Sequence, residues 1–133
     1  MGGGCDDKLQ TGQASDAERL FIWRNDDITR AMSRSSELVP WASHVEWLDR
    51  RLATAEPGLF IAEIDGVPVG TFRIDGDEIS YTVAPDYRSR GYAIAMLKLA
   101  MDSFGPKRAH IFRRNAASIS AARRAGHVVV LLD

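Results

Sequence analysis

Apolar residues follow helical spacing in the first half of the chain. Residues 15–18 and 43–46 both have the capping-box form Ser-x-x-Glu, which satisfies free amides at a helix start. The first box predicts a helix that runs to about Arg24, and the second precedes apolar residues at i, i+3 and i+7 spacing. Residues 8–13 are expected to form a short first strand, and the polar segment 25–41 a loop or a broken helix.

From residue 59 onward the pattern becomes extended. Two Asp-Gly dipeptides, at 65–66 and 75–76, separate β-rich segments, and glycine supplies the positive φ that tight hairpin turns need. This pattern predicts an antiparallel meander of three strands, over residues 59–64, 67–74 and 78–83.

The last third of the chain alternates helix and strand. Apolar residues at helical spacing predict a helix over 91–104, and the Gly-Pro pair that follows ends it. Asn115 is the predicted N-cap of a second helix, and Gly126 is its predicted C′ residue. Strands are expected at 108–112 and 127–132. The element order therefore predicts an α/β domain.

The composition is typical of one soluble globular domain. The chain has 133 residues, 45% hydrophobic and 26% charged, and we expect a disordered tail over 1–7 and a single domain over 8–133. The lone Cys5 excludes an intrachain disulfide, and no apolar run approaches the roughly 20 residues that cross a bilayer. These features predict a cytoplasmic protein. The three dispersed histidines predict no metal site.

The charge is unevenly distributed along the chain. The net charge is -1, and the aromatic signatures of RNA-reading domains are missing, so a nucleic-acid-binding module ranks last among the alternatives. Acidic residues outnumber basic ones in 1–66, whereas basic residues outnumber acidic ones in 67–133. An anionic ligand is therefore expected on the second half.

Anion-binding groups concentrate in residues 83–93, between a predicted strand and a predicted helix. Helix-start amides and two arginines, Arg88 and Arg90, meet there, Gly91 lets the backbone approach a ligand closely, and Ala93 leaves the first turn uncrowded. The segment matches neither a P-loop nor the three-glycine dinucleotide fingerprint. It therefore predicts another kind of phosphate ligand.

Residues 88–93 resemble the acetyl-coenzyme A motif of the Gcn5-related N-acetyltransferases, Arg/Gln-x-x-Gly-x-Gly/Ala. Asn115, Ser118 and Gly126 follow at the spacing of a second block of that family, and the element order is similar to the family fold. The resemblance covers residues 8–132. It implies an α/β (α+β) fold in which a mixed, mostly antiparallel sheet is splayed between its central strands and flanked by helices.

The resemblance also implies the cofactor, acetyl-CoA, and its site. Its pantetheine arm would lie along residues 81–83 and its pyrophosphate on residues 88–93. Asn115 has an alternative, purely structural role as an N-cap. The expected cofactor-binding residues are Tyr81, Thr82, Val83, Arg88, Ser89, Arg90, Gly91, Tyr92, Ala93, Asn115 and Ser118.

Two residues are candidates for catalytic proton transfer. Glu78 begins the strand in which several relatives place a carboxylate that works through water, although it could be an exposed strand-end charge. His44 titrates near neutrality, although a histidine in a first helical turn is often only polar surface. Many members protonate the leaving thiolate with a helix tyrosine, and that position is Ala122 here, so another group or water must do so. No side chain is placed to form a covalent acyl-enzyme, so direct transfer is expected.

The acceptor is expected to be an amine. Residues 23–26 and 44–47 resemble the subgroup that acetylates nucleotide-linked amino sugars, such as the pseudaminic acid pathway enzyme, and ribosomal-protein and spermidine acetyltransferases share parts of this signature. We therefore expect a primary amine of a small molecule, with amino sugars favoured, or a peptide N-terminus. The candidate substrate-binding residues are Arg24, Asn25, Arg30 and Trp47.

Two further expectations concern activity and assembly. Ala122 and the short C-terminal end favour an alternative in which the protein is a non-catalytic acyl-CoA-binding sensor. Many members add another strand where this chain ends, at Asp133. An open sheet edge would follow, and a homodimer could cover it.

Overall fold

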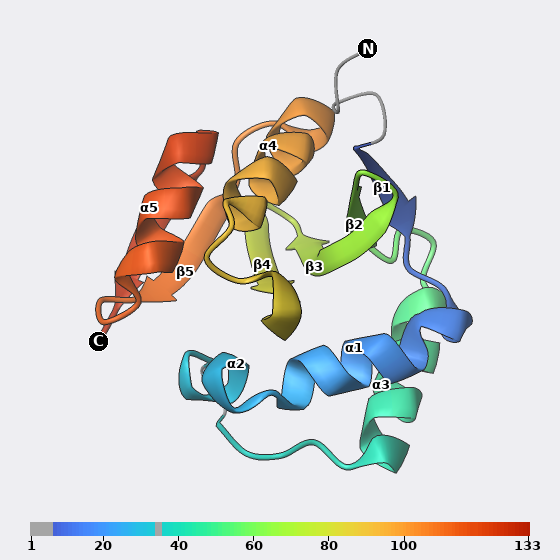
Figure 1. The fold of residues 1–133 in the computed structure, drawn as a ribbon. Coiled ribbons are helices and arrows are strands. Elements are labelled where there is room, and N and C mark those ends of the chain that lie inside the picture. The colour runs from blue at the N-terminus through green and yellow to red at the C-terminus, as the bar shows by residue number, and fades with distance from the viewer. Residues whose placement is uncertain (1–6, 34–35) are drawn as a thin grey trace.

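The computed structural model describes residues 7–33 and 36–133, and one mixed β-sheet forms its centre (Figure 1). The strands are β1 (Lys8–Thr11), β2 (Leu59–Ile64), β3 (Val67–Asp75), β4 (Glu78–Val83), β5 (Arg108–Phe112) and β6 (Val128–Leu132). They lie side by side in chain order. The first four pair antiparallel, whereas β5 runs parallel to β4 and β6 parallel to β5.

Helices cover both faces of this sheet. They are α1 (Ala17–Asn25), α2 (Asp27–Ala31), α3 (Trp41–Leu52), α4 (Tyr92–Phe104) and α5 (Ala116–Ala125), with short 3₁₀ turns η2 (Ala14–Asp16) and η3 (Pro85–Tyr87). The first three lie on one face and the last two on the other (Figure 1). Phe72 and Leu97 belong to the apolar cluster under α4 and α5, and Leu48 and Ile61 to the cluster under α1 and α3. Within the described residues, no helix has the length and apolar character that a membrane crossing requires.

The predicted meander is confirmed, and its turns explain why. Asp65 and Gly66 both have positive φ, 54° and 78°, which is the backbone of a two-residue hairpin turn. In the next hairpin Gly76 has a positive φ of 62°. The turn there is formed by residues 76–77 and not by 75–76, so β3 extends one residue beyond the prediction, to Asp75. These turns fix the register that pairs Arg73 with Ser80.

Both predicted capping boxes are wrong. The Asp16 carboxylate accepts a hydrogen bond from the Gln13 amide (2.8 Å), so the chain turns one step earlier, through η2, before α1 begins. Helix α3 begins at Trp41, after Pro40 at the N-cap. The Asn25 side chain exchanges two hydrogen bonds with the backbone of Val39 (2.8 and 2.9 Å), and this holds the segment before α3.

The predicted ends of the last helix are confirmed. The Asn115 side chain accepts a hydrogen bond from the Ser118 amide (3.3 Å), and Gly126 ends α5 in the left-handed region at φ 99°. His127 lies outside β6, contrary to the prediction. It is buried, with Nδ1 accepting from the Lys107 amide (3.0 Å) and Nε2 donating to the Leu97 carbonyl (2.9 Å).

Of the tail predicted over residues 1–7, the structure describes only Asp7. Residues 1–6, including Cys5, lie outside the described residues, and the carboxylate of Asp7 accepts a hydrogen bond from the Asp65 amide (3.2 Å). Strands β4 and β5 pair at a single position, Glu78 with Arg108. Beyond it they diverge, as the predicted splay requires, and the facing edge of β4 has no ladder partner among the described residues.

Candidate active site

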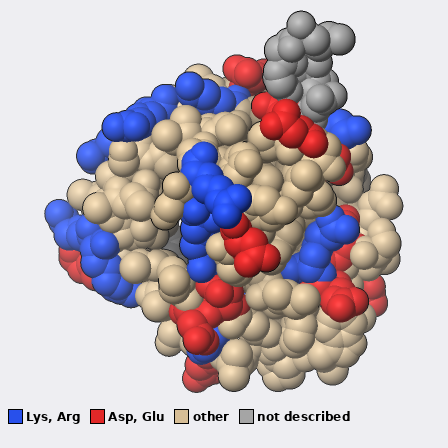
Figure 2. Space-filling model, in the orientation of Figure 1, with Lys and Arg blue, Asp and Glu red and all other residues tan. Residues whose placement is uncertain are grey.

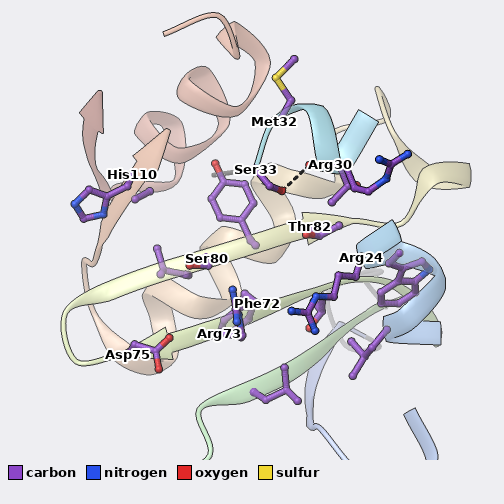
Figure 3. A pocket seen from close by; sticks show the side chains of 18 of the residues that line it. Arg24, Arg30, Met32, Ser33, Phe72, Arg73, Asp75, Ser80, Thr82 and His110 are labelled. Atoms are coloured by element: carbon purple, nitrogen blue, oxygen red, sulfur yellow. Dashed lines mark hydrogen bonds between the residues drawn. The ribbon is translucent and has the colours of Figure 1, made fainter. Parts of the chain in front are cut away.

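A cavity of about 490 Å³ lies where β4 and β5 diverge, on the side covered by α1, α2 and α3 (Figure 3). Successive side chains of a strand point to opposite faces, so alternate residues of β3 and β4 form its floor. Arg24, Trp47 and His110 approach from α1, α3 and β5. The floor residues are Thr71, Arg73, Asp75, Glu78, Ser80 and Thr82.

Glu78 lies in this cavity at the end where β4 and β5 still pair. Its Oε2 is 3.5 Å from Nδ1 of His110, the residue that β5 presents from across the gap. Nδ1 of His110 is buried and has no hydrogen-bond partner among the described residues. The neighbouring Asp77 lies in the exposed turn, where it pairs with Arg108 (3.4 Å). Sequence reasoning missed His110, although the alternation of β5 could have placed it on the cavity side.

The structure corrects the catalytic role predicted for His44. Its side chain is fully buried, Nε2 donates to the Ala17 carbonyl (2.9 Å), and Nδ1 is 3.4 Å from Nη1 of Arg24. Both ring nitrogens are therefore engaged, and no nitrogen is left to accept a proton from an amine. Burial lowers the pKa of His44, a lowering that the Ala17 hydrogen bond opposes and the Arg24 charge reinforces. His44 is a neutral tie between α1 and α3.

This role predicts how stability depends on pH. The unfolded histidine binds a proton as the pH falls through about 6.5, whereas the folded one resists protonation, so the free energy of unfolding should decrease on acidification. His44→Phe should cost about 1–3 kcal/mol at pH 7.5, because the Ala17 carbonyl loses its donor. The variant should also lose less stability between pH 7.5 and 5. Urea unfolding at the two pH values measures both effects. If the free energy of unfolding fell by the same amount between pH 7.5 and 5 in the variant and the wild type, the role of His44 would be contradicted.

The substrate residues predicted from sequence divide into two groups. Arg24 and Trp47 face the cavity. The Asn25 side chain instead donates a hydrogen bond to the Val39 carbonyl. The Arg30 guanidinium donates hydrogen bonds to the Asp27 carboxylate (2.7 Å) and to the carbonyls of Asn25 (3.1 Å) and Ser36 (3.0 Å). Asn25 lies outside the cavity lining and is structural, so the prediction that it binds substrate is corrected. Arg30 also lines the cavity, and its predicted contact with substrate stays a prediction. Local sequence does not reveal the Asn25 contacts, because they join α1 to the segment before α3.

Tyr81 connects the two sides of the gap. Its side chain lies on the α4/α5 face of β4, and its hydroxyl is hydrogen-bonded to the Ser118 hydroxyl and donates to the Ser118 carbonyl (3.0 Å) on α5. Burial raises the pKa of Tyr81, an effect that the Ser118 hydrogen bond partly offsets, so the phenol keeps its proton. Ser118 lies four residues before the fully buried Ala122, on the same helix face.

The loop between β4 and α4 is shaped for an anion. Ser89 and Gly91 have φ of 61° and 81°, and among the described residues no side chain caps the start of α4. A Cβ at Gly91 would meet nothing within 4 Å. Figure 2 shows basic side chains in a strip over this region of the molecule. The loop therefore offers unpaired amides, an open approach and positive charge.

Arg88 has a partner within the protein. Its guanidinium is hydrogen-bonded to the Asp26 carboxylate and to Oγ1 of Thr29 (2.9 Å). Burial alone would raise the pKa of Asp26, but the hydrogen bonds from Arg88, Thr29 and Ile28 and the Arg88 charge together hold it below its usual value. Arg88 thus ties α2 to the loop, and Arg90 is left exposed beside the ring of Tyr87.

Comparison with known proteins agrees with this geometry. Residues 8–128 match the family model described as an acetyltransferase (GNAT) domain. The chain belongs to the GNAT acetyltransferase family. The resemblance found in the sequence is thereby confirmed, together with the enzyme class, an N-acetyltransferase, and its cofactor, acetyl-CoA. No curated protein matches the chain closely enough to be counted as a relative.

Solved structures share the GNAT fold. YncA from Salmonella typhimurium, solved with acetyl-CoA, has 21% sequence identity and a TM-score of 0.70 over 91% of this chain and 79% of its own. The ribosomal L7/L12 α-N-protein acetyltransferase RimL, solved with coenzyme A, has 13% identity and a TM-score of 0.74 over 94% and 81%. The aminoglycoside acetyltransferase AAC(6')-Ib, solved with ribostamycin and coenzyme A, has 15% identity and a TM-score of 0.72 over 91% and 82%.

The residues present fit acetyl-CoA. The open edge of β4 offers backbone groups to an extended chain, and the uncapped start of α4 offers amides to a pyrophosphate. Ala84 donates its amide to Val69 of β3 (2.7 Å), so the alternation of backbone groups turns the Val83 amide toward the gap.

Proposed function

We propose that this acetyltransferase transfers the acetyl group directly to a primary amine of a small molecule, with amino sugars and nucleotide-linked amino sugars favoured, or to a peptide N-terminus. The observation that carries the proposal is the position of Glu78. Its carboxylate lies in a cavity that is lined by residues of both β4 and β5, where these two strands diverge. An amine in this cavity would lie between the Glu78 carboxylate and the gap between β4 and β5, where the cofactor is expected.

The chain's own residues divide the binding work. Backbone groups of Tyr81 and Val83 would hold the pantetheine arm, whereas the backbone of Thr82 is turned toward Thr71 of β3. The amides from Ser89 to Ala93, with Arg90, would hold the pyrophosphate. When bound, acetyl-CoA supplies a thioester whose carbonyl carbon is open to an amine. The Val83 amide would donate a hydrogen bond to the carbonyl oxygen. Asn115 and Ser118 would flank the arm from α5.

Proton transfer is assigned to two side chains. Glu78 would accept a proton from the acceptor ammonium through ordered water, with His110 beside it, because Val83 lies five residues further along β4, roughly 17 Å at about 3.4 Å per residue. The Tyr81 hydroxyl would supply a proton at the other end of the gap, since Ala122 has none to give. This pair replaces the assignment of His44 made from sequence.

Gly91 provides a test of the cofactor site. Gly91→Val should weaken acetyl-CoA affinity at least about tenfold, because a side chain would occupy the open approach to the loop. Strain at positive φ should also cost about 1–2 kcal/mol of stability. Gly66→Val is the matched control: Gly66 has φ 78° and equally open surroundings, in the turn between β2 and β3. Calorimetry with acetyl-CoA and thermal unfolding separate the two effects.

Amine-dependent thiol release, screened over amino sugars, polyamines and peptide N-termini, tests the transfer itself. Release with one class supports the proposal and names the acceptor. Acetyl-CoA binding without release from any amine would instead support the sensor alternative. Equal losses of affinity in Gly91→Val and Gly66→Val would show that Gly91 is only structural.

A further inference from the structure

We propose that the acceptor carries an anionic group, a carboxylate or a phosphate, and that Arg24 and Arg73 bind it beside Trp47. This inference rests on the proposed function, since it assigns the acceptor side of the same cavity. Arg24 and Trp47 are among the substrate-binding residues predicted from the sequence, whereas Arg73 is predicted only as part of a strand. Figure 3 shows Arg24 and Arg73 among the side chains that line the cavity.

Three elements bring the two arginines together. Arg24 comes from α1 and Arg73 from β3, and both guanidinium carbons lie near the ring of Trp47 on α3, at 4.9 and 5.5 Å from its centroid. The Trp47 ring attracts both guanidinium groups by cation–π interaction, which leaves their N–H groups able to donate hydrogen bonds to other partners. Burial lowers the pKa of both; for Arg73, repulsion from Arg51 and Arg24 adds to the lowering, and the charges of Asp75 and Glu78 oppose it.

Among the described residues these two guanidinium groups have no carboxylate within ion-pair distance, although the charges of Asp75 and Glu78 favour the charged form of Arg73. Arg30, the third arginine of the cavity lining, pairs with Asp27 (2.7 Å), and Arg51 pairs with Asp75 (3.1 Å). Within residues 7–33 and 36–133, neither Arg24 nor Arg73 forms an ion pair. Placing two like charges together at a partly buried site has a free-energy cost that a bound anion would offset.

The position of the pair also determines what else the ligand must carry. Arg73 lies opposite Ser80, which is two residues from Glu78 along β4, a spacing of roughly 7 Å at about 3.4 Å per residue. An anion on the arginines would thus hold an amine a few bonds away, close to the Glu78 carboxylate. The geometry fits a molecule with an acidic group and a primary amine, such as an amino acid or an amino-sugar phosphate.

Anion binding can be measured without knowing the acceptor. The probes are inorganic phosphate and acetate, titrated by calorimetry at constant ionic strength into protein saturated with coenzyme A, which fills the anion site at α4. Phosphate binding at millimolar concentration that Arg73→Gln weakens at least about tenfold is the expected result for a phosphate-bearing acceptor, and the same loss with acetate is expected for a carboxylate-bearing one. Arg73→Lys should recover part of the affinity, because lysine keeps the positive charge but lacks the planar pair of donors with which a guanidinium binds an anion.

The control removes an equal charge elsewhere. Arg50 lies on α3 in an exposed pair with Glu46 (2.8 Å), outside the cavity, so Arg50→Gln should bind both probes like the wild type. Equal affinities in wild type and Arg73→Gln, or no binding of either probe, would overturn the proposal. If coenzyme A fails to bind, the proposed function fails, and the difference between wild type and Arg73→Gln still decides whether the arginines bind anions.

Discussion

Replacing Glu78 by glutamine is expected to lower kcat/KM about 10²- to 10⁴-fold, the range that general-base catalysis contributes. The amide keeps the size of the side chain but cannot accept a proton from the acceptor amine. Because Glu78 lies at the closed end of the gap, away from the loop that begins α4, the affinity for acetyl-CoA should stay unchanged. Thiol release under steady-state conditions measures the first quantity, and calorimetry the second.

Two comparisons keep this prediction specific. Asp77→Asn removes a carboxylate from the adjacent residue, which is exposed in the turn and outside the cavity, so its kcat/KM should equal that of the wild type. His110→Gln removes the neighbour of Glu78 on β5. A larger loss of kcat/KM in His110→Gln than in Glu78→Gln would assign the role of proton acceptor to the His110 imidazole. Full activity in Glu78→Gln would show that the Glu78 carboxylate is not the proton acceptor.

The sheet and the glycine-bearing loop before α4 could be predicted because their signals are local. Each hairpin turn needs positive φ within a two-residue segment, and an Asp-Gly dipeptide provides it wherever it stands. The segment 83–93 likewise carries its glycine, its arginines and its helix start within a few positions. Asn115 and Gly126 mark the ends of α5 for the same reason.

The acceptor side of the cavity could be predicted only in part, because its residues come from separate elements. Arg30 and Arg73 are the same residue type, yet Arg30 bonds to Asn25 of α1 and to Asp27 of its own helix, whereas Arg73 lies against the Trp47 ring of α3. His44 has the titration behaviour of a base, but burial against α1 engages both nitrogens. His110 becomes a partner of Glu78 only through the pairing of β4 with β5. Each of these roles depends on tertiary contacts that spacing along the chain does not encode.

Replacing Tyr81 by phenylalanine is expected to lower kcat about 10²-fold, the lower end of the range for general acid–base catalysis. A leaving thiolate needs a proton, and the helix position that supplies a tyrosine in many GNAT enzymes is Ala122, which is fully buried. The Tyr81 hydroxyl reaches the same face of α5 from the other side of the gap, at Ser118. Its raised pKa keeps it protonated at neutral pH, which is the state a proton donor needs.

The measurement must separate this role from simple packing. Phenylalanine keeps the ring within its apolar cluster, so loss of the Ser118 hydrogen bonds should cost only about 1 kcal/mol of stability and leave the acetyl-CoA affinity within about twofold. Ser120→Ala removes a hydroxyl from an exposed position of α5 and should change neither kcat nor stability. A Tyr81→Phe enzyme that loses stability but keeps its kcat would make the hydroxyl a structural link across the gap. The proton for the thiolate would then come from water.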